Sequence, residues 1–140
     1  KKDLVKLQQG EYVALSKVEN ALKRSEYVDL PMVYAKSTHS YCIALVCPAL
    51  PALTSFAKSQ GLPEDDIEAL CSNDKVIKEV SKSCLAACKA AKLTGFEIPQ
   101  KIGLVADPWT PENDMLTAAM KLKRNQIVAK HKKQLDTLYT

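Results

Sequence analysis

The chain carries one unbroken apolar run, Tyr41-Cys42-Ile43-Ala44-Leu45-Val46-Cys47, in the first half of its 140 residues. A short apolar run bounded by turn residues is typical of a strand that is buried on both faces. The preceding residues 37–40, Ser-Thr-His-Ser, have the composition of a turn, and residues 31–36 begin with a proline that suits the start of a strand. We therefore expect residues 31–36 and 41–47 to pair antiparallel, with the second as the central strand.

Helical segments follow this pair. Prolines open a helix over residues 48–61, which a glycine ends. Asn73 or Ser72 is placed to cap a longer helix in which apolar residues recur at three-to-four spacing, with Gly95 as its C-terminal stop. Residues 97–106 predict a third strand, and the last helix is expected to begin near Leu122.

The N-terminal segment predicts a hairpin. Residues 4–7 and 11–15 have strand patterns and are separated at Gly10. Residues 16–19, Ser-Lys-Val-Glu, have the spacing of a capping box and predict a helix start. The fold class is therefore α+β: a small three-stranded, mainly antiparallel sheet with packed helices and a two-stranded N-terminal hairpin, in one domain over residues 1–140.

Charge is unevenly distributed along the chain. The net charge of +4 is too small to indicate a nucleic-acid partner. Residues 115–134 contain no acidic residue, yet they hold six basic ones: Lys121, Lys123, Arg124, Lys130, Lys132 and Lys133. A local positive field suits phosphate-rich ligands or an anionic membrane surface, although a solvated helix face has the same pattern.

The five cysteines predict buried, reduced thiols rather than a disulfide framework. Their number is odd and no pair has CxxC spacing. Cys84 and Cys88 share a helix face, but no clustered histidine supplies further ligands, so we expect no metal site. Reduced thiols indicate a reducing compartment.

Two N-terminal features are candidate functional elements. Lys2 and Asp3 precede the first strand, where charged exposed residues suit a hinge or simply a solvated entry segment. Gly10, followed by Glu11 and Tyr12, would let another backbone or an extended ligand approach closely, or would only make a tight turn. The opening Lys1-Lys2-Asp3 also resembles a cut within a larger protein.

A third candidate lies near the last helix. Lys121 is expected at the helix start, where its ammonium group on a long stem could reach a carboxylate or phosphate of another domain. Arg124, one turn on, could orient this loop or pair with an acid, and Trp109 is expected to be a packing anchor. The alternative is an exposed basic helix start.

No complete active site is evident in the sequence. His39 lies in a turn and is expected to face solvent, while lysines around His131 should discourage its protonation. No nucleophile–base pairing and no glycine-rich phosphate loop appears. The chain alone is therefore not expected to catalyse a reaction.

Taken in order, these segments resemble the C-terminal domain of the adenylate-forming ligases, specifically the long-chain acyl-CoA synthetase branch. The resemblance covers nearly the whole chain. It is carried by residues 1–13, 17–22, 96–99, 108–112, 116–117 and 121–124. Two positions depart from the family pattern: Met120 stands where many members have glycine before the lysine, and Asn113-Asp114 where glycine often follows Pro-Glu.

The resemblance implies a mobile lid of a fatty acid–CoA ligase. In such enzymes a fatty acid and Mg-ATP give an acyl-adenylate, and coenzyme A then gives the thioester and AMP. Residues 1–3 would be the hinge to an N-terminal adenylation domain, and the fragment alone would be inactive. Lys121 would be the catalytic lysine that contacts carboxylate and phosphate oxygens.

The resemblance also implies secondary roles. The coenzyme A tunnel would be lined by Gly10, Glu11, Tyr12 and Lys6, and the catalytic loop would be supported by Trp109, Thr117 and Arg124. The protein would be intracellular, cytosolic or peripheral on an organelle membrane such as the endoplasmic reticulum or peroxisome. The competing hypotheses are a basic binding module that docks on a membrane or protein partner, and a related ligase that uses another acid.

Overall fold

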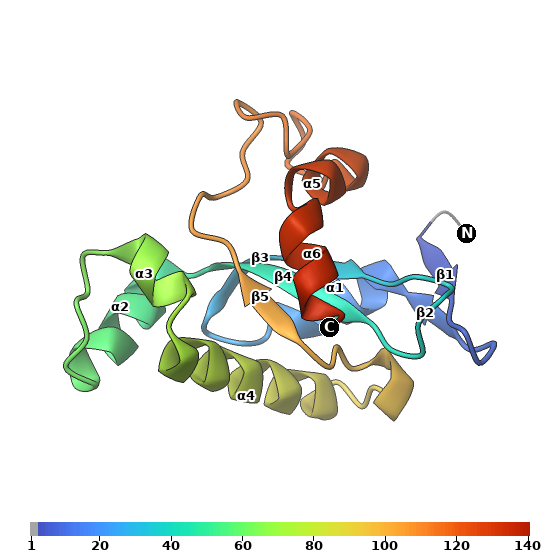
Figure 1. The fold of residues 1–140 in the computed structure, drawn as a ribbon, viewed down its shortest axis with the longest axis horizontal. Coiled ribbons are helices and arrows are strands. Elements are labelled where there is room, and N and C mark those ends of the chain that lie inside the picture. Colours follow the sequence, from blue (N-terminus) through green and yellow to red (C-terminus); the bar gives the residue numbers. More distant parts are fainter. Residues whose placement is uncertain (1–2) are drawn as a thin grey trace.

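A three-stranded sheet lies at the centre of the molecule, and the computed structural model describes residues 3–140 around it (Figure 1). The strand order is β3 (Val28–Tyr34), β4 (Ile43–Pro48), β5 (Ile102–Leu104). Every residue of β4 is buried, which confirms the central strand predicted from the apolar run.

The sheet is mixed, because β3 and β4 run antiparallel while β4 and β5 run parallel. A third strand over the whole of residues 97–106 was a wrong prediction, since only three residues pair with β4. The preceding residues wind instead into the 3-10 turn η1 (Gly95–Glu97), closed by a capping box between Thr94 and Glu97. A parallel pairing needs a crossover connection, which the helices between β4 and β5 provide.

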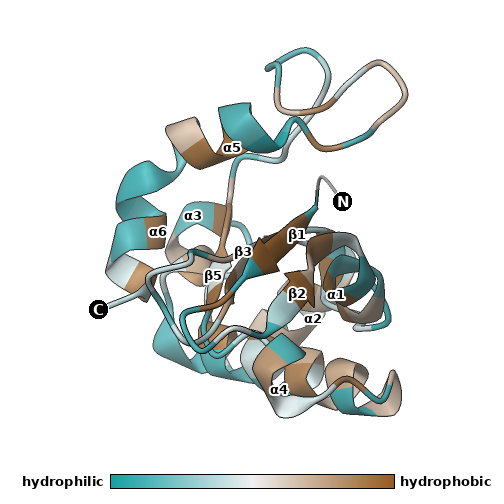
Figure 2. Ribbon diagram, turned by 90° about the vertical axis from the view of Figure 1, so that its right-hand side faces the viewer, coloured by the Kyte–Doolittle hydropathy of each residue, from teal (hydrophilic) through white to brown (hydrophobic). Residues whose placement is uncertain are grey.

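Helices cover both faces of the sheet (Figure 2). One face packs against α1 (Leu15–Leu22), α2 (Leu50–Ser59), α3 (Ile67–Cys71) and α4 (Asp74–Ala90). The other packs against the segment after β5 and the two last helices, α5 (Arg124–Lys130) and α6 (Lys132–Leu138). Alternate residues of β4 therefore enter two separate apolar clusters.

The longest helix, α4, begins as predicted. The Asn73 side chain accepts hydrogen bonds from the backbone N–H groups of Lys75 and Val76, at 2.9 and 3.2 Å. Gly95 is not its stop, because the helix already ends at Ala90. Lys92 takes a left-handed backbone conformation with φ of 62°, which turns the chain away earlier.

The predicted hairpin is present as β1 (Leu4–Lys6) and β2 (Tyr12–Ala14). The predicted capping box at residues 16–19 is wrong. Helix α1 begins two residues earlier than a cap at Ser16 predicts, and Asp3 accepts from the free N–H of Ser16 at 3.3 Å in place of a local cap. Glu19 is thereby free for a contact across the fold.

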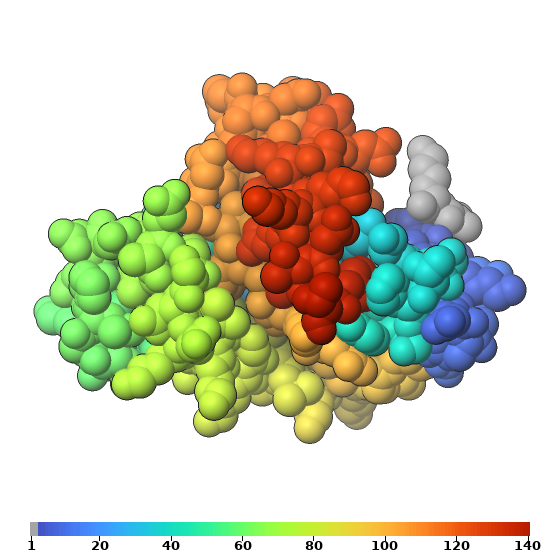
Figure 3. Space-filling model, in the orientation of Figure 1, coloured from blue at the N-terminus to red at the C-terminus, as the bar shows by residue number. Residues whose placement is uncertain are grey.

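The C-terminal segment passes close to the sheet and forms the upper part of the face in Figure 3. A Cβ at Gly103 would lie 2.9 Å from Gln134 Nε2 and 3.0 Å from a methyl of Leu138, so α6 packs closely on β5 at this glycine and a larger residue would require these side chains to move. None of the helices within residues 3–140 has the length and apolar content needed to cross a bilayer.

All five cysteines are buried and free. Burial raises the pKa of Cys88 to about 11 and that of Cys84 to about 12. Both thiols therefore stay protonated near neutral pH and are poor nucleophiles. These positions serve as small apolar core residues.

Candidate functional site

Lys121 lies in a tight exposed turn and not inside a helix. The Thr117 N–H donates to the Lys121 carbonyl at 2.8 Å, and the Lys121 N–H donates to the Thr117 hydroxyl at 3.1 Å. Leu116 and Leu122 form an antiparallel bridge on either side. The expected helix start near Leu122 is therefore wrong by two residues, since α5 begins at Arg124.

Met120 and Asp114 stand at or near positions where glycine was expected, and the backbone shows how the loop accommodates them. Met120 has φ of 65°, a left-handed conformation that suits glycine, and its side chain is 60% exposed. Asp114 likewise has φ of 68°, so one residue of the Asn113-Asp114 pair adopts the left-handed angle that glycine commonly supplies. The loop thus keeps a glycine-like backbone without glycine.

Trp109 is the buried anchor of the loop over residues 108–123, as predicted. Its side chain is 2% exposed, and its Nε1–H donates to His131 Nε2 at 3.0 Å. Between Trp109 and the lysine turn, the Asn113 side chain accepts from the Thr110 N–H at 3.0 Å and donates to the Pro108 carbonyl at 2.9 Å. The loop is therefore ordered by its own hydrogen bonds.

An ion pair between Arg124 and Glu19 ties the lysine turn to the rest of the fold. Arg124 Nη1 lies 2.7 Å from Glu19 Oε2, and Nη2 lies 3.2 Å from Oε1. Glu19 is 6% exposed and also accepts from the Val33 N–H at 2.8 Å. One carboxylate therefore joins α1, β3 and the first residue of α5 in a charge-assisted, bidentate contact.

Glu19 was not among the predicted site residues, because its spacing from Ser16 suggested a capping role. The available signal was its position next to Val18 on the buried face of the helix. A charged residue is rarely buried unless it is paired. That rule would have predicted a partner elsewhere in the chain.

The lysine turn borders a hollow of about 420 Å³ between α1 and β3. Lys23 and Lys121 line it, together with Arg124 and Glu19. Since Glu19 is already paired with Arg124, the uncompensated charge at this hollow is positive. It suits an anionic group such as a phosphate or carboxylate.

Most other basic side chains near the C-terminus have acidic partners. Of the six in residues 115–134, four form ion pairs: Lys123–Asp114, Arg124–Glu19, Lys130–Asp107 and Lys132–Asp136. Within residues 3–140, Lys121 and Lys133 are the two of this group without one. Of these two, only Lys121 lines the hollow.

The second candidate group lies at the tip of the hairpin. Gly10 has φ of 99°, and a Cβ placed there would meet no atom within 4 Å. Tyr12 is 55% exposed, and Lys6 Nζ lies 5.9 Å from its ring centre. Glu11 continues the exposed surface. The structure thus brings Lys6, Gly10, Glu11 and Tyr12 together on one open edge.

Asp3 connects the chain entry to α1. Its carbonyl accepts from the Leu15 N–H at 2.9 Å, and its carboxylate accepts from Ser16. Hydrogen bonding from Ser16 lowers the pKa of the Asp3 carboxyl. Lys2, the other predicted hinge residue, lies outside the described residues.

The histidines occupy different environments. His39 is half-buried and stacks on Tyr139 with ring centres 3.9 Å apart, so the expectation that it faces solvent is wrong. Burial, with a smaller effect of Lys130, lowers the pKa of His131. The Trp109 hydrogen bond needs an unprotonated Nε2, which agrees with this direction.

Two plant proteins similar in sequence to this chain are both long chain acyl-CoA synthetases. No protein-family profile matches the chain. It is 51% identical over 139 residues to long chain acyl-CoA synthetase 8 of Arabidopsis thaliana, covering 99% of this chain and 19% of that protein. It is 36% identical over 126 residues to the peroxisomal long chain acyl-CoA synthetase 6 of the same plant, covering 90% of this chain and 18% of that protein.

A solved structure has the same fold. The A domain of carboxylic acid reductase from Segniliparus rugosus, in complex with AMP and a co-purified carboxylic acid, matches with a TM-score of 0.83 and 31% identity. The match covers 99% of this chain and 20% of that one. The chain thus spans about a fifth of the length of these proteins.

Proposed function

The chain belongs to the long-chain acyl-CoA synthetases, as a domain of about a fifth of their length, and on this premise we propose that it is their mobile C-terminal lid. In the whole enzyme it would serve ATP-dependent activation of a fatty acid to the acyl-adenylate. It would then serve thioester formation with coenzyme A and release of AMP. The described residues hold no complete active site, so the fragment alone is expected to be inactive.

One observation carries the proposal: Lys121 is a cation without an acidic partner within residues 3–140, held on an ordered turn at a positive hollow. Its ammonium would contact carboxylate and phosphate oxygens during adenylation. Preorganised positive charge stabilises the negative charge that develops in such a transition state. Thr117, Trp109 and Arg124 would hold the turn in place.

The hairpin is proposed to act in the second half-reaction. The open surface at Gly10 would let the pantetheine arm of coenzyme A pass close to the backbone. Glu11, Tyr12 and Lys6 would line that passage. Asp3, hydrogen-bonded to the start of α1, would transmit rotation at the hinge with Lys2 to the whole domain.

Cofactors and partners follow from this role. The hollow at Lys121 fits a phosphate or carboxylate of the adenylate, but no group of three acidic, histidine or cysteine residues within residues 3–140 could hold a metal ion. We therefore assign Mg²⁺, and most of the ATP and fatty-acid contacts, to an N-terminal adenylation domain. No nucleic-acid partner is proposed.

For localisation, we propose an intracellular protein, cytosolic or peripheral on an organelle membrane such as the endoplasmic reticulum or peroxisome. Two observations support this: five free, buried thiols and similarity to a protein named peroxisomal. Docking of a basic module on a membrane is the weaker alternative, because four of the six basic side chains in residues 115–134 are neutralised by acids.

The test uses the longer ligase that contains this chain. Lys121→Ala should slow acyl-adenylate formation by about 100-fold to 1,000-fold, the usual cost of losing one preorganised charge contact. Adenylation is followed as pyrophosphate release. Lys133→Ala, which removes the other basic side chain without an acidic partner, is the matched control and should have wild-type rates. Unimpaired adenylation by Lys121→Ala would refute the assignment.

A further inference from the structure

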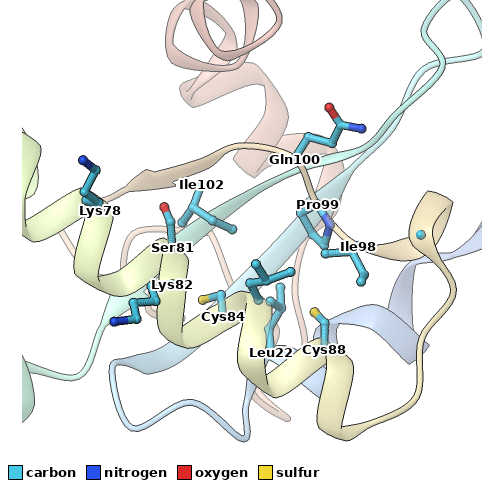
Figure 4. A pocket seen from close by; sticks show the side chains of 12 residues that line it. Leu22, Lys78, Ser81, Lys82, Cys84, Cys88, Ile98, Pro99, Gln100 and Ile102 are labelled. Carbon is cyan, nitrogen blue, oxygen red and sulfur yellow. The ribbon is translucent and has the colours of Figure 1, made fainter.

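A second hollow, on the α4 side of the sheet, is not used by the proposed lid function. It has a volume of about 600 Å³, within the range of small-molecule sites, and lies between α4 and residues 95–102 (Figure 4). It shares no lining residue with the hollow at Lys121. It is therefore a separate hollow from the one proposed to serve adenylation.

The walls of this hollow are mostly apolar. Leu22, Cys84, Cys88 and Ile102 contribute buried side chains to its lining. Leu85, at its border, is 42% exposed and extends the apolar lining to the surface. Such a lining suits an alkyl chain rather than a polar ligand.

The charged residues of the hollow are all of one sign. Lys78 and Lys82 line it from successive turns of α4, and no acidic residue lines it. Neither lysine has an acidic partner among residues 3–140. The neighbouring hollow over β5 differs, since it is lined by acidic and basic side chains alike.

The positive charge and the apolar lining lie at different positions along α4. In Figure 4 Lys78 and Lys82 both lie nearer the start of α4 than Cys88, Ile98 and Pro99, and their ammonium groups leave the helix in different directions, so they give this end of the hollow a positive field and do not form a two-lysine clamp. A ligand that fits has an anionic head at the lysine end and an apolar tail toward Pro99. A positive end and an apolar end together match a single-chain carboxylate.

We propose that this hollow is a binding site for a free fatty acid, with Lys78 and Lys82 at the carboxylate and the tail over Cys84 and Cys88. The ligand would bind beside the sheet, remote from Lys121, and would not be the molecule that is activated there. The proposal goes beyond the ligase role and does not depend on it. It can be tested with the 140-residue chain, which buries both of its apolar clusters without another domain.

The probe is dodecanoate below its micelle concentration, titrated into the chain by calorimetry and by backbone amide NMR. We expect a dissociation constant on the order of 10–100 µM, with octanoate at least about tenfold weaker because fewer methylenes are buried. Amide shifts should be confined to α4 and residues 95–102. Dodecyltrimethylammonium, with the same tail and a cationic head, should bind at least about fivefold more weakly.

Two variants separate charge from shape. Lys78→Gln with Lys82→Gln should weaken binding about fivefold, while Lys75→Gln with Lys89→Gln, an equal charge loss on α4 outside the hollow, should change it less than twofold. Ser81→Leu should narrow the hollow and weaken binding with no change in charge. Both lysines are exposed, so thermal unfolding should stay unchanged in the lysine variants and exclude misfolding.

Several outcomes would overturn the proposal. These are no binding of dodecanoate at 1 mM, equal binding of the cationic amphiphile, an undiminished affinity of the Lys78→Gln, Lys82→Gln variant, or shifts centred on Lys121. A concentration-dependent dimer with the same amide shifts would show that a second copy covers the hollow. None of these results would bear on adenylation, which is measured separately.

Discussion

Two exposed turns carry the two proposed half-reactions, and they are built differently. The turn at Gly10 takes a left-handed conformation with a glycine, whereas the turn before Lys121 takes one with Met120. The first closes a hairpin whose strands pair by backbone hydrogen bonds. The second is a single bridge, tethered by the Arg124–Glu19 ion pair and by Trp109.

The difference shows which turn depends on particular side chains. The Gly10 turn is fixed mainly by main-chain contacts, including the Gln8 N–H to the His39 carbonyl at 3.0 Å. The Lys121 turn has local hydrogen bonds too, but it is tied to the rest of the fold by side chains: the Arg124–Glu19 ion pair, whose partners lie far apart in sequence, and the Trp109 indole, which donates to His131. Substitutions at these anchors should therefore disturb Lys121 and leave Gly10 in place.

The largest effect on the free energy of unfolding is expected from removing Trp109, the apolar anchor of the Lys121 turn. Trp109→Ala should lower the free energy of unfolding by about 3–5 kcal/mol, the usual cost of removing a buried tryptophan. Urea denaturation measures this loss. Trp109→Phe should recover part of it, and a loss below about 1 kcal/mol for the alanine variant would show that the ring is not an anchor.

The next largest effect on stability is expected from removing the Arg124–Glu19 ion pair. Glu19→Gln should cost about 2 kcal/mol, less than for a fully buried pair because the Arg124 side chain is 29% exposed. Hydrogen exchange should accelerate at residues 116–124 and not in the hairpin. Asp136→Asn, in the exposed pair with Lys132, is the control and should cost less than about 0.5 kcal/mol. Equal costs would remove the special role of Glu19.

Removing a glycine from one turn and adding one to the other compares the backbone strain of the two turns. Gly10→Ala should cost about 1 kcal/mol, since alanine is strained at φ of 99°, while Met120→Gly should be neutral or stabilising by up to about 1 kcal/mol. Gly95→Ala is the control, because its Cβ would meet nothing within 4 Å and its φ is ordinary. Destabilisation by Met120→Gly would mean that the methionine side chain itself holds the turn.

The smallest effect is a pH dependence on the Lys121 side. Burial gives His131 a lower pKa in the folded chain than the ordinary 6.5, so the unfolded chain takes up the proton first on acidification. Its contribution to stability is present above pH 6.5 and is lost as the pH falls below it. His131→Gln, which keeps an acceptor for Trp109, should flatten the melting temperature between pH 7.5 and 5.5. An unchanged slope would exclude His131 as its origin.

Much of the fold could be predicted from local pattern. The apolar run gave β4, and the residues around Gly10 gave the hairpin, because both signals lie within a few neighbouring residues. The direction of β5 and the early end of α4 could not be predicted this way. The direction of β5 depends on the crossover through the helices between β4 and β5, and the early end of α4 depends on Lys92, where a non-glycine residue takes a left-handed angle.

The candidate site was predicted less completely. Lys121, Thr117 and Trp109 stand out by order along the chain, and resemblance to a family gives them roles. Glu19 is 105 residues from its partner Arg124, and no local pattern reports a contact at that separation. The same limit hid the pairing of Lys130 with Asp107, which leaves Lys121 more distinctive than its charge-rich surroundings suggested.

The most direct test places one substitution in each turn of the longer ligase and measures the rates of both half-reactions for each variant. Lys121→Ala should slow acyl-adenylate formation by about 100-fold or more and leave thioester formation from supplied acyl-adenylate within about threefold. Gly10→Val should have the reverse pattern, because its side chain would enter the proposed path of coenzyme A. If both variants slow the same half-reaction, or if Lys121→Ala adenylates at the wild-type rate, the division of labour between the two turns is wrong.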